Sequence, residues 1–185
     1  MTKEGKRQFV HIALFLVAFL LKYLTKFQAG TLLLVLFAIT LYIIPHLRFR
    51  SYFYRSFEKK YSQGAVLYFL VLFVLVLIFP LPIVAVSWAV LALGDGSATL
   101  VGRHFRAREL PWNREKTYAG SLAFIIFGTL GAFILLRWMT PELDNTFSIA
   151  LKTAIVAAIA ESFHWQINDN ATVAVTSAVV LSFLI

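Results

Sequence analysis

The chain has 185 residues, of which 60% are hydrophobic and 14% charged, and its mean hydropathy is +0.80. Because soluble domains are about 45–50% apolar and about 25% charged, this composition excludes an ordinary soluble protein and predicts an all-α polytopic membrane protein. The net charge of +8 does not indicate a nucleic-acid partner, since most basic residues flank apolar segments and suit anionic membrane lipids. Because the chain has no cysteine, thiolate chemistry is excluded.

Seven apolar segments predict transmembrane helices, most of them within the ~17–25 residues that a bilayer requires. Pro80 and Pro82 divide one long uncharged run into two of these helices, because proline ends or kinks a helix. We predict a single domain over residues 1–185, since no repeat or low-complexity segment divides the chain. The predicted spans are residues 7–26, 29–46, 64–80, 82–102, 118–139, 146–163 and 169–185.

The distribution of lysine and arginine predicts the orientation of these helices. With seven spans, the side of the N-terminus carries 13 basic residues, whereas the opposite side carries Lys22, Lys26, Arg137 and Lys152. The positive-inside rule therefore places the N-terminus in the cytoplasm. We expect the plasma membrane of a prokaryote, with the active site facing the cytoplasm. The 13 residues are Lys3, Lys6, Arg7, Arg48, Arg50, Arg55, Lys59, Lys60, Arg103, Arg106, Arg108, Arg114 and Lys116.

Two basic loops lie on this cytoplasmic side, at residues 46–63 and 103–117. In the first loop Phe49, Phe53 and Phe57 recur at four-residue spacing between basic residues. This pattern is typical of a short amphipathic helix lying in the membrane interface, although an ordinary basic loop accounts for it equally well. The second loop would attract an anionic ligand through its arginines.

Asp95 is the first charged residue after the 34 uncharged residues 61–94. A carboxylate at the end of such an apolar helix is costly and usually has a partner or a bound cation. Asp95, Thr99 and Arg103 share one helix face, which favours a site over a structural ion pair, because Asp95 and Arg103 are about 12 Å apart along the helix. The adjoining stripe of small residues, which allows close helix packing within or between protomers, consists of Gly94, Ala98 and Gly102.

The segment 116–121 begins the next predicted helix. Helix N-termini have free N–H groups and a positive dipole end, so they bind anions. Lys116 suits phosphate by its charge, and Gly120 by allowing close backbone approach. A basic loop that leads into a helix often looks similar, so the segment gains weight only from its neighbours.

Acidic and amide side chains mark the turn between the last two predicted helices. Glu161 ends one helix, and Asn168, Asp169 and Asn170 begin the next. These hard oxygen ligands suit Mg²⁺. Helix N-capping is the alternative role for Asn168 or Asp169, but it does not account for Glu161.

The first helix carries Glu4, Arg7 and His11 on one face, for which an interfacial anchor is the favoured role. The chain has no His-Glu-x-x-His pair and no Cys/His cluster, so a zinc site is not expected. It also has neither a P-loop nor a nucleophile elbow.

Three segments together resemble the polyprenol kinase family, which includes dolichol, phytol and farnesol kinases and the CTP-dependent diacylglycerol kinase. The family is related in fold to the phosphatidate cytidylyltransferases. Its glycine-rich run with a leading aspartate resembles residues 93–103, its Lys-Ser/Thr-x-Glu-Gly-Ser-x-Ala segment resembles residues 116–123, and its Asp-Asn-x-Thr-Val-Pro segment resembles residues 169–174. The family's Arg-Lys-x-x-His start loosely resembles residues 6–11. The resemblance covers nearly the whole chain.

The resemblance implies a CTP-dependent kinase that uses Mg²⁺ to phosphorylate a membrane lipid alcohol, such as polyprenol, dolichol, phytol or geranylgeraniol. Asp95 and Asp169 would bind the metal with support from Asn170, while Glu161 would position or deprotonate the acceptor hydroxyl. The residues expected to hold phosphate are Gly102, Arg103, Lys116, Thr117, Gly120 and Ser121, with Lys116 also catalytic. A homo-oligomer is compatible with the glycine stripe.

This chain departs from the family pattern at Ala119 in place of Glu, Asn168 in place of Asp and Ala174 in place of Pro. These departures bear on metal binding at the last helix. Two alternative functions stay open: a cytidylyltransferase that forms a CDP-lipid, and a non-enzymatic small transporter or scaffold. A transporter usually has its charges near the midplane of the membrane, whereas the charges here cluster at one face.

Overall fold

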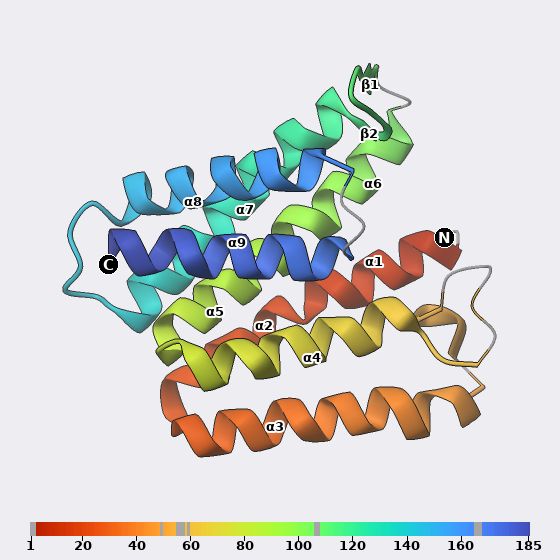
Figure 1. Ribbon diagram of the computed structural model, residues 1–185, viewed down its shortest axis with the longest axis horizontal. Coiled ribbons are helices and arrows are strands. Elements are labelled where there is room, and N and C mark those ends of the chain that lie inside the picture. Colours follow the sequence, from red (N-terminus) through yellow and green to blue (C-terminus); the bar gives the residue numbers. More distant parts are fainter. Residues whose placement is uncertain (1–2, 49, 55–57, 59, 106–107, 165–167) are drawn as a thin grey trace.

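A computed structural model describes residues 3–48, 50–54, 58, 60–105, 108–164 and 168–185 as a bundle of helices with one small hairpin (Figure 1). Its elements in chain order are α1 (Lys3–Ala13), α2 (Phe15–Ala18), η1 (Phe19–Tyr23), α3 (Lys26–Ala38), η2 (Ile39–Ile43), η3 (Ile44–His46), η4 (Arg50–Tyr52), α4 (Gln63–Ile78), α5 (Leu81–Ala89), η5 (Val90–Asp95), α6 (Gly96–His104), β1 (Glu109–Leu110), β2 (Asn113–Thr117), α7 (Tyr118–Met139), α8 (Thr146–Ser162) and α9 (Asp169–Leu184).

Apart from the short turn η4, the helical elements of the described residues form seven rods when grouped by continuity, and these follow the seven predicted segments to within a few residues. Three rods are long and apolar enough to cross a membrane, namely Lys26–His46, Leu81–His104 and Tyr118–Met139. The prediction of an all-α membrane protein is confirmed at this level. The full count of seven spans and their orientation stay predictions.

Local chemistry sets the ends of the rods where the sequence places polar caps or proline. Thr25 and Gln28 form a capping box at the start of α3, with Thr25 Oγ1 accepting from the Gln28 amide and Gln28 Oε1 accepting from the Thr25 amide. Pro80 is the N-cap of α5, and α4 ends at Ile78. The proline pair therefore separates two rods, as predicted.

The rod Leu81–His104 lies at the centre of the bundle, with 83% of its most apolar window buried, compared with 28% for Lys26–His46. Trp88 is fully buried in this rod, and its Nε1 donates a 2.7 Å hydrogen bond to the Tyr68 hydroxyl of α4. Burial of an indole requires such a partner for its N–H group. The central position of this rod places Asp95 inside the protein.

The central rod changes to π-helical geometry over η5, and Asp95 is the last residue of that segment. π-Helical turns are frequent at functional sites because they re-aim side chains within a helix. Immediately after η5, the small-residue stripe packs on α7: a Cβ on Gly120 would lie 3.0 Å from the Ala98 carbonyl oxygen and 3.6 Å from Gly102 Cα. The stripe therefore serves packing within this chain.

A short antiparallel hairpin joins α6 to α7, although the sequence predicts no strand in the basic loop 103–117. Asn113 Nδ2 donates to the Ser162 carbonyl at 3.1 Å, and Trp112 Nε1 donates to Ser162 Oγ at 3.3 Å. These bonds fasten the hairpin to the end of α8. The two hydrogen bonds to Ser162 thereby fix the position of β2 and of its residue Lys116.

In the loop 46–63, the described residues include the short 3₁₀ turn η4. Phe49 and Phe57 lie outside the described residues, so the predicted interfacial helix stays a prediction. Tyr54 and Ser62 bind back to the loop, with the Tyr54 hydroxyl donating to the Lys60 carbonyl at 3.1 Å and Ser62 Oγ donating to the Phe53 carbonyl at 2.7 Å.

Candidate active site

A polar cavity of about 490 Å³ lies at the end of the bundle that carries the hairpin and the N-terminus. It brings together segments that are far apart in the sequence, including α1, α6, β2 and the adjoining ends of α7, α8 and α9 (Figure 1). Its volume is within the range of small-molecule sites. The lining residues are Glu4, Arg7, Ala98, Thr99, Gly102, Arg103, Glu115, Lys116, Thr117, Gly120, Ser121, Glu161 and Asp169.

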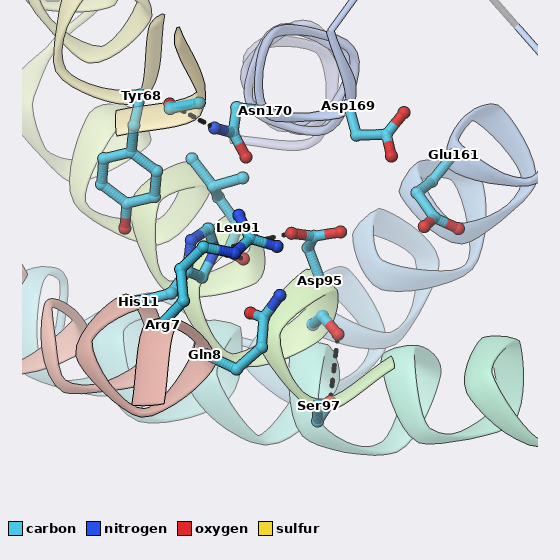
Figure 2. A network of polar contacts seen from close by, with 12 residues as sticks. Arg7, Gln8, His11, Tyr68, Leu91, Asp95, Ser97, Glu161, Asp169 and Asn170 are labelled. Carbon is cyan, nitrogen blue, oxygen red and sulfur yellow. Dashed lines mark hydrogen bonds and ion pairs between the residues drawn. The ribbon is translucent and has the colours of Figure 1, made fainter. Parts of the chain in front are cut away.

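Three carboxylates converge beside this cavity, from Asp95, Glu161 and Asp169. One oxygen from each lies within 4.8 Å of the other two, and Figure 2 shows the three side chains facing a common space. Asp95 and Glu161 are buried, whereas the Asp169 side chain is 45% exposed. Asp95 and Glu161 therefore form the buried part of the cluster, and Asp169 extends into the cavity.

Lys116 is the cationic partner of this cluster. Its Nζ donates to Asp169 Oδ2 at 2.8 Å and also to the Glu161 carboxylate. Burial would by itself lower the pKa of Lys116, but the negative charges of Glu161, Asp95 and Asp169 raise it above its ordinary value. Lys116 is therefore protonated at neutral pH.

The charges of the cluster do not balance. With all three carboxyl groups ionised, the cluster and Lys116 carry a net charge of −2, and Asp95 and Glu161 are too buried for water to neutralise it fully. A divalent cation would restore balance, and oxygen ligands are those that Mg²⁺ prefers. The donor set therefore fits one Mg²⁺ ion, with Asp95, Asp169 and Glu161 as the groups that can reach it.

Asn170 and Asn168 have structural contacts at the start of α9. Asn170 Nδ2 donates to the Gly64 carbonyl of α4 at 2.8 Å (Figure 2). Asn168 Oδ1 accepts from the Asn170 amide at 3.0 Å, so Asn168 is the N-cap. Both contacts orient the first turn of α9, which carries Asp169 between them.

The start of α7 forms another wall of the cavity. Thr117 is its N-cap, and Thr117 Oγ1 accepts from the Gly120 amide at 3.1 Å. Ser121 Oγ is buried and has no hydrogen-bond partner among the described residues. An unpaired hydroxyl beside a helix N-terminus suits an anionic ligand. Arg103 also lines the cavity, with 66% of its side chain exposed.

The first helix contributes Glu4 and Arg7, for which the spacing favours an interfacial anchor. Both residues line the cavity, so they belong to the candidate site as well. Arg7 Nε donates to Glu4 Oε1 at 3.1 Å, and Glu4 Oε2 lies 3.8 Å from Arg103 Nη1. The spacing of Glu4 and Arg7 revealed a shared face, but only the packing of α1 against α6 shows that this face meets the site.

His11 continues this face towards Asp95. Its Nε2 donates to the Leu91 carbonyl at 3.1 Å and lies 3.6 Å from Asp95 Oδ2. The ring edge packs on Tyr68, with the ring centroids 4.8 Å apart. A second, smaller pocket of about 60 Å³ begins here and shares Arg7 with the polar cavity.

Comparisons with known proteins find relatives that are named as phytol kinases or as a farnesol kinase. The chain is 30% identical over 137 residues to a probable chloroplastic phytol kinase of Triticum aestivum, covering 69% of this chain and 46% of the relative. It is 31% identical over 112 residues to phytol kinase 1 of Arabidopsis thaliana (55% and 37% covered). It is 32% identical over 95 residues to the farnesol kinase of the same plant (48% and 31% covered).

The chain spans less than half the length of these curated relatives. No family model matches the chain, and no solved structure matches it. The relatives are named as chloroplastic proteins, which does not fit the predicted prokaryotic plasma membrane. Membrane association itself is supported by the long apolar helices.

Proposed function

The chain is a relative of the phytol and farnesol kinases, and from this kinship we propose that it transfers a phosphoryl group from a nucleoside triphosphate to an isoprenoid alcohol. The donor we propose is CTP, and the product is the monophosphate of the alcohol. The cytidylyltransferase and transporter alternatives are not favoured by any of these relatives.

The observation that carries this proposal is the composition of the polar cavity. A carboxylate cluster with its lysine forms one wall, and a helix N-terminus with the unpaired Ser121 hydroxyl forms another. Phosphoryl transfer depends mainly on positioning and on neutralising charge, and these walls offer both to a polyphosphate.

In the proposed reaction, the alcohol oxygen forms a bond to the γ-phosphorus while the bond from that phosphorus to the β–γ bridging oxygen breaks. The nucleoside diphosphate leaves with the electron pair, and the hydroxyl proton passes to Glu161. Lys116, Gly120, Ser121 and Arg103 hold the phosphates. Mg²⁺ on Asp95 and Asp169 would supply charge neutralisation at the phosphate oxygens.

We further propose that all seven rods span the membrane and that the site opens on the side of the N-terminus. Arg7, Arg103 and Lys116 line the cavity at this end of the bundle, which agrees with the positive-inside rule. By this rule the N-terminal side is the cytoplasm, where soluble nucleotides are found. The basic residues around Arg103 would attract the negative charge of a nucleotide.

CTP that carries the label in one chosen phosphate tests the reaction directly. Purified protein in detergent is incubated with Mg²⁺, CTP labelled in either the α- or the γ-phosphate, and a panel of isoprenoid alcohols or of their monophosphates. Transfer of γ-label to the lipid supports the kinase. Transfer of α-label to a lipid monophosphate would indicate a CDP-lipid product and overturn the proposal, as would failure to label any alcohol with γ-labelled CTP, ATP, GTP or UTP.

A further inference from the structure

Much of the lining of the smaller pocket next to the polar cavity is apolar. These apolar side chains come from α1, the residue that follows it, the residue after η4, and α4, and they are Val10, Leu14, Phe53, Ala65 and Phe69. Its volume of about 60 Å³ holds roughly four to six water-sized groups. It is therefore large enough for one end of a hydrocarbon chain and too small for a whole isoprenoid.

The same pocket has a polar edge beside the carboxylate cluster. This edge is formed by Arg7, His11 and Asn170. His11 Nε2 lies 3.6 Å from Asp95 Oδ2, and Asn170 directly follows Asp169 in α9. In Figure 2, Arg7 and His11 lie on one side of Asp95, and Glu161 lies on the other. A molecule in the pocket would thus have one end beside the site.

The polar cavity itself cannot take a hydrocarbon chain. Ala98 is the sole residue with an apolar side chain among its described lining residues, if the glycines are set aside.

We propose that this pocket holds the hydroxyl-bearing end of the isoprenoid alcohol, with the first isoprene unit against Ala65 and Phe69 and the oxygen reaching past the edge formed by Arg7 and His11 to the carboxylate cluster, where Glu161 takes its proton. The inference rests on the proposed function and adds the place and direction of the acceptor. An alcohol has one polar end and an apolar body, which is the distribution of this pocket's walls.

The place proposed for the hydroxyl-bearing end is called the acceptor seat below. A variant that fills the smaller pocket tests this acceptor seat without changing a residue of the polar cavity. Ala65→Leu adds bulk where Ala65 lines the pocket, and its amide still caps on Ser62 Oγ. Val66→Leu places the same leucine side chain at the next residue of α4, outside the pocket lining, and adds one carbon rather than three. We expect Ala65→Leu to raise KM for geranylgeraniol about tenfold or more, with KM for the nucleotide unchanged, and Val66→Leu to leave both unchanged.

A second measurement does not depend on turnover. Geranylgeraniol with a diazirine in its first isoprene unit is photolysed with the wild-type protein, and the labelled peptides are identified. Labels on α1 near Val10 and on α4 near Phe69, weakened by Ala65→Leu and not by Val66→Leu, support the seat. Labels on other segments, or labelling and KM unaffected by Ala65→Leu, overturn it.

The two proposals fail in different ways. A wild-type protein that phosphorylates no alcohol but is labelled in the pocket would end the kinase proposal and keep the acceptor seat. An active kinase whose labels lie outside the pocket would end the acceptor seat and keep the kinase.

Discussion

The two ends of the helical bundle use their cationic side chains in different ways. At the end away from the hairpin, Lys22 Nζ donates to the Trp138 carbonyl at 2.7 Å and lies 4.5 Å from the centre of the Trp138 ring. Lys26 Nζ donates to the Leu77 carbonyl at 3.1 Å. These cations satisfy the carbonyls at helix C-termini, which is an ordinary structural role.

At the hairpin end, the cation Lys116 meets carboxylates instead, and they outnumber it. This arrangement is expensive for folding, because buried carboxylates without enough positive charge are costly in an apolar surrounding. The comparison teaches that a charge at a helix end is not informative by itself. An excess of one sign in a buried place indicates a ligand of the opposite sign.

Among substitutions at the two ends of the bundle, Asp95→Asn at the hairpin end is expected to reduce activity the most. The variant keeps the side-chain shape and removes one negative charge from the cluster, so we expect phosphoryl transfer to fall by a factor of about 10²–10³ or more, as for loss of one electrostatic stabiliser. Asp144→Asn in the exposed turn at the other end is the matched control and should keep full activity. Turnover of γ-labelled CTP measures both, and a fully active Asp95→Asn would remove Asp95 from the site.

Lys116→Met should affect both activity and folding. It leaves Glu161 buried without its cation, which costs about 3–5 kcal/mol for a broken buried pair. We expect a lower unfolding temperature, and a larger rise of that temperature with added Mg²⁺ than in the wild type, because the ion replaces the missing charge. Lys152→Met on the exposed side of α8 is the control. An equal Mg²⁺ response in wild type and both variants contradicts the cation site.

Gly120→Ala tests the contact that holds the phosphate wall in place. The new Cβ would lie 3.0 Å from the Ala98 carbonyl oxygen, and because that atom is backbone, α6 and α7 must separate. We expect a loss of about 1–3 kcal/mol in stability together with reduced activity. Gly30→Ala, whose Cβ would meet only Phe73 and Val76 side chains at 3.7 and 3.9 Å, should leave activity unchanged and raise stability by up to about 1 kcal/mol, because alanine favours the helix interior. Thermal unfolding and turnover of the two variants decide the matter.

Substitutions at the opposite end should have the smallest effect. Lys22→Met and Lys26→Met each remove one exposed hydrogen bond to a carbonyl, so we expect the unfolding temperature to fall by about 1–3 °C. Turnover should remain at the wild-type level. Loss of activity in either variant would mean that the far end of the bundle influences the site and that its lysines are not purely structural.

Apolar patterning and proline positions were enough to predict the helical rods. The break at Pro80 and the start of α7 at Tyr118 follow from local rules that act within a few residues. The candidate residues Asp95, Lys116 and Asp169 could also be chosen from the sequence, because charges next to long apolar segments are rare and costly.

What the sequence could not determine is which charges meet. Glu161 and Lys116 are 45 residues apart, and they pair because Trp112 and Asn113 fasten the hairpin to the end of α8. The face of Glu4, Arg7 and His11 suggested an anchor by its spacing, yet packing of α1 against the central rod turns it into the wall between two cavities. Local patterns fix which residues form helices and caps, since those interactions are made within one turn of chain. The contacts between rods depend on packing across the whole bundle, and only the tertiary structure decides them.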